Sequence, residues 1–452
     1  MQAWKIVTVL LFAYFGLATL YNLAVPVGEA PDEPSHIQYT EIILKTGQLP
    51  TIPLGSERYS YEAEQPPLYY LLATGWIRLF WSSDKLAPDL QSNPDFSFAN
   101  ETPYNAYLPN YPPTYTLPVH LLRLFSTLIG LLTLLLTWLS AREIWPDVSD
   151  DSGASKLRGG LYAGALAVGF VALLPGFTFT SGTVTNDTLA AATGAGVLFV
   201  ALRILKRGLN LQMAALAGIV LGLAILSKWS LAVFVPLVLV VCLFSVAKSW
   251  PSRIASMAVL LGATVLVGGW PFVSNLLEYG DPLATSARQL AKNEIASPLA
   301  NMPFFWLDRG YIGGLLDSLW GVFGLRNLEL PSLVYLPYYL LLLLGLVLGV
   351  FLLRRGEHFE RRAIAVCLLV VILIYAGVAW QNSQFWAIQG RLLLPGLAAL
   401  ALVVGRGVDV VLSLLLNSQR RVFIGTLAML SGLFALNMYA IVARLIPAYW
   451  NQ

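Results

Sequence analysis

Charged residues are scarce in this chain. Asp, Glu, Lys and Arg make up 12% of its 452 residues, while 57% are hydrophobic and the mean hydropathy is +0.68. Soluble domains carry about 25% charged residues, so the composition excludes an ordinary soluble protein. We expect an all-α polytopic membrane protein whose partner is the lipid bilayer. Residues 1–452 should form a single integral membrane domain, with no separate soluble domain.

The chain also lacks the residues and motifs of several common sites. Its 2 cysteines, Cys242 and Cys367, lie within apolar runs, which argues against a disulfide framework and a thiolate metal site. No C-x-x-C, Walker A or G-x-G-x-x-G pattern is present, so the common nucleotide-binding motifs are excluded. The net charge of +3 is too small to indicate a nucleic-acid partner.

Long hydrophobic runs are abundant, and they predict about 11 transmembrane helices. The expected spans are 6–25, 119–140, 159–180, 189–202, 209–227, 230–247, 254–273, 331–353, 363–380, 392–404 and 422–443. A cleaved signal peptide is the alternative for the first run, but its length and the later spans favour a helix. Residues 405–421 either lengthen the tenth helix or lie along the inner surface.

Two long polar segments, 26–118 and 274–330, separate some of these spans. Within the first, Pro34 and Gly47 bracket a short interfacial helix, and a second one follows Pro66-Pro67 and runs to Phe80. Lys and Arg concentrate in the other, shorter connections, whereas acids concentrate in the long ones. The positive-inside rule therefore predicts a multi-pass protein of the cell membrane with a cytoplasmic N-terminus and an active face that is external or periplasmic.

By this parsing, the interior of every span is free of Asp, Glu, Lys and Arg. Arg123, Lys228 and Arg391 lie close to outer ends of spans. Ion-coupled carriers usually keep ionisable groups near the middle of the membrane, so the pattern favours chemistry at the outer surface. Gly218 and Gly222 form a small-xxx-small pair, which is typical of helix packing.

The first candidate cluster is Asp32, Glu33 and His36, directly after the first span. Asp32 would stand at the amino end of a helix, where the helix dipole favours an ionised carboxylate. Simple helix capping is the alternative. Two consecutive acids and a histidine beside the bilayer favour a functional site.

Further candidates lie at other outer turns. Asn186 and Asp187 precede the fourth span, where Asp187 either caps the helix or joins Asp32 in one site. Glu64, Gln65 and Tyr69 surround a rigid Pro-Pro pair. The cations Lys228 and Arg391, with Gln389, either reach toward lipid headgroups or bind a phosphate.

These motifs resemble those of the GT-C membrane glycosyltransferases. The likeness is greatest to the protein O-mannosyltransferase-like and aminoarabinose-transferase-like branches, or to a related uncharacterised family of bacterial membrane proteins. It covers about residues 1–230, and the remainder matches by topology. The matching features are Pro31-Asp32-Glu33, the helix ending at Gly47, Gln65-Pro66-Pro67-Leu68-Tyr69-Tyr70, Arg123, Asn186-Asp187, Lys228 and Gln389-Gly390-Arg391. Gln65 is a departure, because several relatives have His or Lys before Pro-Pro.

The resemblance implies transfer of a sugar from a polyprenyl-phosphate donor to an acceptor of the cell envelope, which could be a lipid, a glycan or a protein. Asp32 would be the general base, Asp187 a second acid at the reaction centre, and Lys228 and Arg391 phosphate ligands. Glu33 would be a further catalytic acid, and His36, Glu64, Gln65, Tyr69, Asn186 and Gln389 would bind substrate. Some relatives need a divalent ion such as Mg²⁺ or Mn²⁺ and others do not.

Two other functions remain open from the sequence. A non-enzymatic carrier or flippase for a lipid-linked sugar would use the same outer cations to hold phosphate. A cell-envelope polysaccharide polymerase or ligase would differ in acceptor more than in chemistry. The sequence names neither the sugar nor the acceptor.

Overall fold

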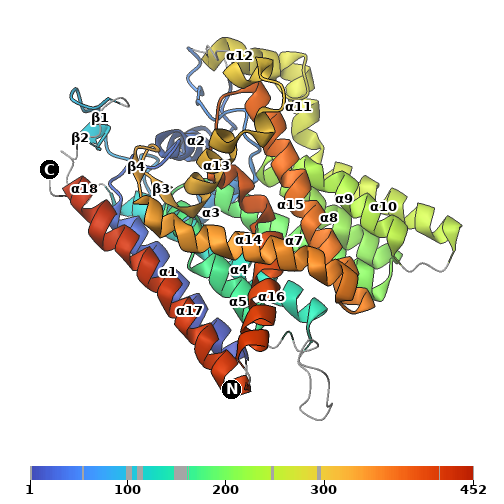
Figure 1. The fold of residues 1–452 in the computed structure, drawn as a ribbon. Helices are drawn as coiled ribbons and strands as arrows, with labels where there is room; N and C mark the ends of the chain where they lie inside the picture. The colour runs from blue at the N-terminus through green and yellow to red at the C-terminus, as the bar shows by residue number, and fades with distance from the viewer. Residues whose placement is uncertain are drawn as a thin grey trace.

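The computed structural model describes residues 3–52, 55–97, 104–108, 116–146, 160, 162–245, 249–292, 297–416 and 418–450. Long apolar helices form most of this part of the chain (Figure 1). Eight helical segments within it have the length and composition to cross a membrane. They are α1 (Ala3–Ala24), α4 (Leu117–Ile144), α7 (Asp187–Arg207), α10 (Trp250–Gly268), α14 (Ser332–Arg355), α15 (His358–Gln384), η6 with α16 (Gly390–Gly396 and Leu397–Leu415), and α17 with η7 and α18 (Gln419–Tyr439, Ala440–Leu445 and Ile446–Trp450).

The three other predicted spans are also helical over their described residues, but they differ from regular spans. One is a bent pair, α5 (Ala163–Ala172) and α6 (Pro175–Ser181), whose axes differ by 60°. The break precedes Pro175, which has no N–H to donate to the preceding turn. The other two are short: α8 (Leu211–Ser227), and η3 (Trp229–Val233) continued by α9 (Phe234–Phe244).

Small residues allow neighbouring helices to approach closely. Gly218 and Gly222 of α8 face α10, where a side chain at Gly218 would lie 2.3 Å from the backbone oxygen of Leu260. Similarly, a side chain at Gly405 of α16 would lie 2.6 Å from the backbone oxygen of Ala163 on α5. The small-xxx-small pair therefore serves helix packing, as its spacing predicts.

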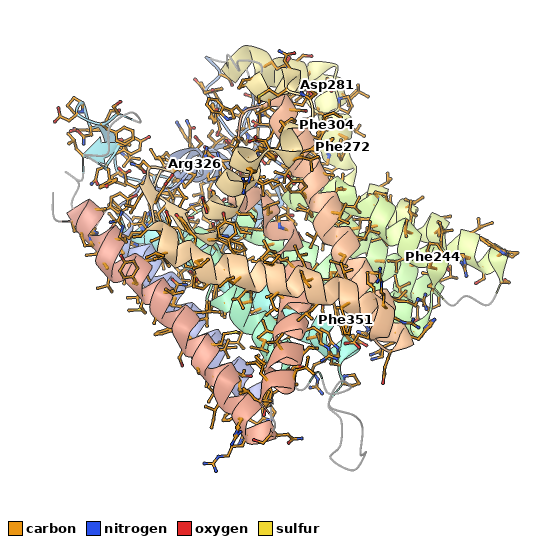
Figure 2. All side chains as sticks on the ribbon, viewed as in Figure 1. Phe244, Phe272, Asp281, Phe304, Arg326 and Phe351 are labelled. Carbon is orange, nitrogen blue, oxygen red and sulfur yellow. The ribbon has the colours of Figure 1, made fainter. Side chains whose placement is uncertain are left out.

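Large apolar side chains cover the outside of the helices. Phe244 is 72% exposed and Phe351 is 41% exposed, and both lie on the flanks of the bundle (Figure 2). Such a surface is unfavourable in water but suits a hydrocarbon environment. The exposed apolar flanks and the long helices together agree with a multi-pass membrane protein.

A cap of shorter elements covers the end of the bundle opposite the N-terminus (Figure 1). It holds α2 (Glu33–Thr46), α3 (Leu68–Arg78), the β1–β2 pair (Gln91–Ser92, Tyr107–Leu108), α11 (Trp270–Tyr279), α12 (Thr285–Lys292), η4 (Pro298–Asn301), η5 (Phe305–Leu307), α13 (Arg309–Gly321) and the β3–β4 hairpin (Val322–Phe323, Leu328–Glu329). Both predicted short helices are present. Pro34 lies in the first turn of α2, and Gly47 ends that helix with a φ of +68°.

The expectation that span interiors contain no charge is wrong for α16. This helix continues to Leu415 and carries Arg406 and Asp409, each 2% exposed. Arg406 donates to Glu360 of α15 at 2.7 Å and to Asp409 at 3.0 Å. Mutual neutralisation makes these buried charges tolerable. The network also explains why α16 extends past the point where the hydrophobic run weakens.

Candidate active site

A cavity of about 720 Å³ opens within the cap. Nine of the predicted site residues line it, and they come from segments far apart in the sequence. These are Asp32, His36, Glu64, Gln65, Asn186, Asp187, Lys228, Gln389 and Arg391. The sequence motifs at the outer ends of separate spans therefore meet in one hollow.

Asp32 precedes α2 and has a left-handed backbone with a φ of +60°. This conformation is uncommon for a residue with a side chain, although Asp tolerates it better than most. Its carboxylate makes no capping hydrogen bond to the helix, so capping does not explain its presence. Instead the side chain, 38% exposed, faces the cavity and forms an ion pair with Arg391. Asp32 is the accessible carboxylate of the pair.

Asp187 begins α7 and is only 2% exposed. Its Oδ1 pairs with Lys228, and its Oδ2 lies 3.3 Å from Nη1 of Arg391. The hydroxyl of Thr185 also donates to Oδ2 at 3.3 Å. A carboxylate enclosed by two cations and a hydroxyl is strongly held in its ionised form. Asp187 therefore fixes the positions of Lys228 and Arg391.

Arg391 connects the two carboxylates, and several contacts hold it in place. Nε donates to Oε1 of Gln389 at 2.5 Å, and Nη1 donates to the carbonyl of Pro31 at 3.4 Å. The preceding Gly390 lies against α13, where a side chain would come within 2.0 Å of the Leu319 nitrogen. Only glycine lets η6 approach α13 this closely, and that approach places Arg391 in the cavity.

His36 lies one turn after Asp32 on α2 and is 2% exposed. Its Nδ1 lies 2.8 Å from the hydroxyl of Tyr70, whose ring stacks on Tyr39 at 3.7 Å. Burial lowers the pKa of His36 to about 4, while the charges around it act in both directions. The imidazole is therefore neutral near pH 7 and suits a hydrogen-bonding role more than acid catalysis.

The segment before the Pro-Pro pair forms another wall of the cavity. Gln65 accepts a hydrogen bond from Asn186 at 3.1 Å, and the carbonyl of Glu64 accepts one from Trp229 at 2.6 Å. The carboxylate of Glu64 faces Arg288 at 3.7 Å. These contacts attach the loop to α7, η3 and α12 and give the wall a fixed shape.

Two predicted site residues lie away from the cavity. Glu33 is fully buried, forms a 2.6 Å ion pair with Arg123, and accepts from the backbone of Val184 and Gly28 at 3.0 Å. Burial alone would raise the pKa of Glu33, but Arg123 and these donors lower it below its usual value. Tyr69 is also fully buried and lies 2.8 Å from the hydroxyl of Ser126. Both stabilise the cap beneath the cavity.

The structure adds cavity residues that the sequence did not single out. They are Tyr61, Glu62, Arg288, Pro298, Gln381, Phe385, Trp386, Ala387 and Leu392. Arg288 stacks on the ring of Phe385 at 4.0 Å, so α12 and the segment after α15 form one side of the cavity. Exposed Trp386, at 69%, marks the rim.

A divalent metal does not fit the side chains of this cavity. The carboxylates of Asp32 and Asp187 already face Arg391 and Lys228. Over the described ranges, no group of three or more His, Cys, Asp or Glu side chains is placed to hold an ion. We therefore assign no step to a metal.

The family described as dolichyl-phosphate-mannose-protein mannosyltransferase matches residues 154–271. A search of curated protein sequences gave no match. Solved structures do resemble the chain, at low sequence identity.

Two of them are informative. The structure of ArnT from Cupriavidus metallidurans bound to undecaprenyl phosphate has 15% identity and a TM-score of 0.53, covering 98% of this chain and 73% of ArnT. The archaeal oligosaccharyltransferase AglB from Archaeoglobus fulgidus, in complex with an inhibitory peptide and a dolichol-phosphate, has 13% identity and a TM-score of 0.53. That match covers 97% of this chain and 56% of AglB. At these identities the similarity concerns the fold.

Proposed function

We propose that this chain, which has the fold of the GT-C glycosyltransferases, transfers a sugar from a polyprenyl-phosphate donor to an acceptor. One observation carries the proposal: a single arginine, Arg391, joins an accessible carboxylate to a buried one in a cavity at the capped end of the bundle. Solved structures of similar fold contain undecaprenyl phosphate or dolichol-phosphate, which supports this donor class. The orientation expected from the distribution of charge would place the cavity on the external face.

The cations of the cavity suit the phosphate of the donor. Lys228 uses one of its three N–H donors on Asp187, and Arg391 is held by Asp32 and Asp187. A phosphate that enters the cavity competes with Asp32 for Arg391, because Arg pairs well with phosphate oxygens. Binding of the donor thus frees the carboxylate of Asp32 and brings the leaving group to the cations in one event.

The freed Asp32 is the general base. It removes the proton from an acceptor hydroxyl as that oxygen attacks the anomeric carbon of the sugar. The bond from the anomeric carbon to the phosphate oxygen breaks, and the polyprenyl phosphate leaves with its electron pair. Lys228 and Arg391 stabilise the negative charge that develops on the leaving phosphate. A single displacement of this kind inverts the configuration of the anomeric carbon.

The other lining residues position the sugar. Gln65 and Asn186 present amide groups beside Asp187, and neutral His36 lies on the same face of α2 as Asp32. Exposed Trp386 and Phe385 offer flat apolar surfaces at the rim. Amide groups and aromatic faces of this kind bind sugar hydroxyls and sugar rings.

The test uses purified protein in lipid nanodiscs, supplied with polyprenyl phosphates that carry radiolabelled sugars and with an extract of cell-envelope lipids, glycans and proteins. The proposal predicts label on an acceptor and release of polyprenyl phosphate in equal amounts. In parallel, the protein is reconstituted into vesicles with labelled donor in one leaflet. Movement of intact donor between leaflets, without any transfer of label, would instead identify a carrier and would refute the proposal.

A further inference from the structure

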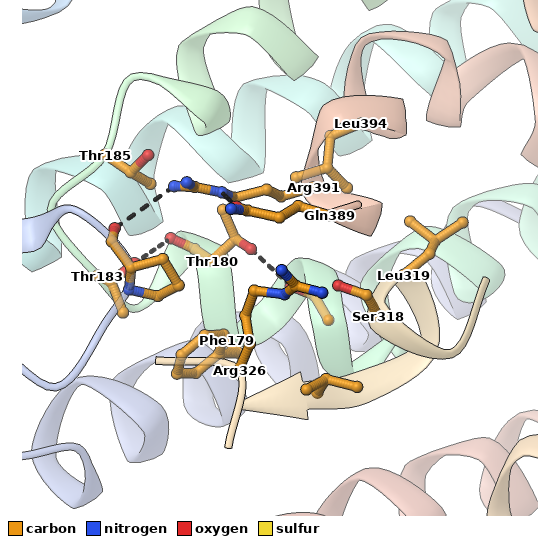
Figure 3. Close-up of a pocket in the computed structure, with 13 residues that line it drawn as sticks. Phe179, Thr180, Thr183, Thr185, Ser318, Leu319, Arg326, Gln389, Arg391 and Leu394 are labelled. Carbon is orange, nitrogen blue, oxygen red and sulfur yellow. Dashed lines mark hydrogen bonds between the residues drawn. The ribbon is translucent and has the colours of Figure 1, made fainter. Parts of the chain in front are cut away.

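A second, smaller pocket lies directly behind Arg391 (Figure 3). It shares Gln389 and Arg391 with the large cavity, and its wall is rich in hydroxyl groups from Thr180, Thr183, Thr185 and Ser318. A second guanidinium, that of Arg326, enters the same pocket from the β3–β4 hairpin. Thr180, Thr183 and Thr185 already donate their hydroxyl protons within the protein. The groups left to attract an anion are therefore the two guanidinium groups and the hydroxyl of Ser318, which accepts from the N–H of Gly390.

Arg326 differs from the other cations of the site because no carboxylate forms an ion pair with it. Within the part of the chain that the structure describes, its guanidinium has no ion-pair partner. Lys228, Arg288 and Arg391, by contrast, each face a carboxylate. Burial and the neighbouring charge of Arg391 lower the pKa of Arg326 below its usual value. An anion placed between the two arginines would relieve this repulsion.

Arg326 has an unfavourable, left-handed backbone conformation. Its φ is +71°, at the turn of a short hairpin closed by a hydrogen bond from its N–H to the carbonyl of Phe323 at 3.1 Å. A left-handed conformation is uncommon for a residue with a Cβ, because the Cβ comes too close to the following carbonyl oxygen. The hairpin thus holds the Arg326 side chain at the pocket at the expense of local strain.

The size of the pocket limits what can enter it. Its volume is about 30 Å³, against about 720 Å³ for the large cavity. The bulk of a lipid-linked sugar therefore stays in the large cavity. Because Arg391 borders both spaces, a phosphate bound at Arg391 in the large cavity can insert one oxygen between Arg391 and Arg326.

We propose that Arg326 is a ligand of the carrier phosphate and receives one phosphate oxygen in the small pocket, while Lys228 and Arg391 hold the group from the cavity side. The inference rests on the function proposed above, since it concerns the same donor. It adds a residue that neither the sequence motifs nor the comparisons single out. The guanidinium of Arg326 has no ion-pair partner among the described residues, whereas Arg391 already uses Nε, Nη1 and Nη2 within the protein.

The test measures binding of polyprenyl phosphate, and of uncharged polyprenol, to protein in nanodiscs. Arg326→Gln should weaken binding of the phosphate about ten-fold, the usual effect of losing one charge-assisted hydrogen bond, and should leave polyprenol binding unchanged. Arg326→Lys should recover part of the loss. Arg444→Gln is the matched control: Arg444 donates to the carbonyl of Glu329 on the same hairpin at 3.2 Å but lines neither pocket.

The outcomes separate the two proposals. If wild-type protein binds polyprenyl phosphate and Arg326→Gln binds it equally well, the role of Arg326 is refuted and the proposed function stands. If the Arg444→Gln control weakens binding as much as Arg326→Gln does, the effect belongs to the hairpin and the role of Arg326 is likewise refuted. If wild-type protein does not bind polyprenyl phosphate, both proposals fall. Weakened binding in Arg326→Gln alone supports the inference, whatever the transfer assay shows.

Discussion

At the scale of single residues, the site depends on two aspartates with different surroundings. Asp32 is partly exposed and has one cationic partner, Arg391, whereas Asp187 is buried between two cations. An accessible carboxylate can take a proton from an acceptor, but an enclosed one mainly orients its neighbours. This difference, and not the order of the residues in the chain, separates the proposed base from the residue that positions the cations.

Glu33 shows why neighbouring residues in a motif need not share a role. Asp32 precedes α2 with a left-handed backbone, whereas Glu33 is the first residue of the helix, so Asp32 faces the cavity while Glu33 faces Arg123 inside the cap. The sequence placed two consecutive acids beside the membrane but could not determine which one pointed outward. Which of the two acids points into the cap depends on Arg123, which belongs to α4 and is distant in the sequence.

Glu29 provides a prediction about pH and stability. It is fully buried, its Oε1 accepts from the N–H of Tyr107 at 2.8 Å, and its Oε2 has no hydrogen-bond partner among the described residues. Burial raises the pKa of Glu29 to about 7. The folded state therefore holds this proton more tightly than the unfolded state, so Glu29 makes folding less favourable as pH rises from about 5 to 8.

Glu29→Gln removes this titration. Thermal unfolding of the variant, measured at several pH values between 5 and 8, should show a smaller loss of stability with rising pH than wild type, by about 2 kcal/mol across the range. Glu57→Gln serves as the control, because Glu57 lies in the same segment between α1 and α4 and its side chain is exposed. Identical pH profiles for wild type and Glu29→Gln would contradict the role assigned to this carboxyl group.

At the scale of elements, η6 sets the position of Arg391 through its contact with α13. Gly390→Ala would place a methyl group 2.0 Å from the backbone nitrogen of Leu319 and 2.5 Å from its Cα. Because backbone atoms cannot move aside easily, η6 must shift and Arg391 must move with it. We expect sugar transfer to fall at least ten-fold, since a displacement of about 1 Å at a catalytic group has effects of this size.

Gly262→Ala is the matched control, since Gly262 of α10 has no atom within 4 Å of an added methyl group. This variant should keep the wild-type rate of transfer. Transfer by Gly390→Ala at the wild-type rate would show that the approach of η6 to α13 does not determine the position of Arg391.

The elements differ in how far the sequence predicts them. Pro34 and Gly47 bracket α2, and Pro-Pro precedes α3, so local signals alone placed both helices correctly. The cavity wall formed by Arg288 and Phe385 was missed, because their contact is a stacking interaction between segments with no shared periodicity. Arg326 was missed for a similar reason: each strand of the β3–β4 hairpin has only two residues, which is too short for a recognisable strand pattern.

At the scale of the whole molecule, charge is buried at several places among the described residues, and two of these places differ in how far the sequence predicts them. One is the cavity, and the other is the cluster of Arg406, Glu360 and Asp409, to which Trp145 donates through a 2.8 Å hydrogen bond to Glu360. The sequence predicted the first because its residues lie at span ends. It missed the second because the partner of Arg406 on α15 lies far away in the sequence.

Arg406→Met should leave Glu360 and Asp409 without their shared cation. Loss of one partner from a buried ionic network costs about 3–5 kcal/mol, so the thermal unfolding temperature should fall clearly. Arg406 lines neither pocket, so the folded fraction should still bind polyprenyl phosphate as wild type does. Exposed Arg420, replaced in the same way, should leave both properties unchanged. A stable Arg406→Met protein that binds no carrier phosphate would contradict this separation.

The most direct test of the account compares sugar transfer and carrier binding in wild type and Asp32→Asn. If Asp32 is the general base, transfer should fall at least 100-fold. Because the variant removes the carboxylate that competes for Arg391, its affinity for polyprenyl phosphate should match or exceed that of wild type. Transfer by Asp32→Asn at a rate close to that of wild type would contradict the central claim.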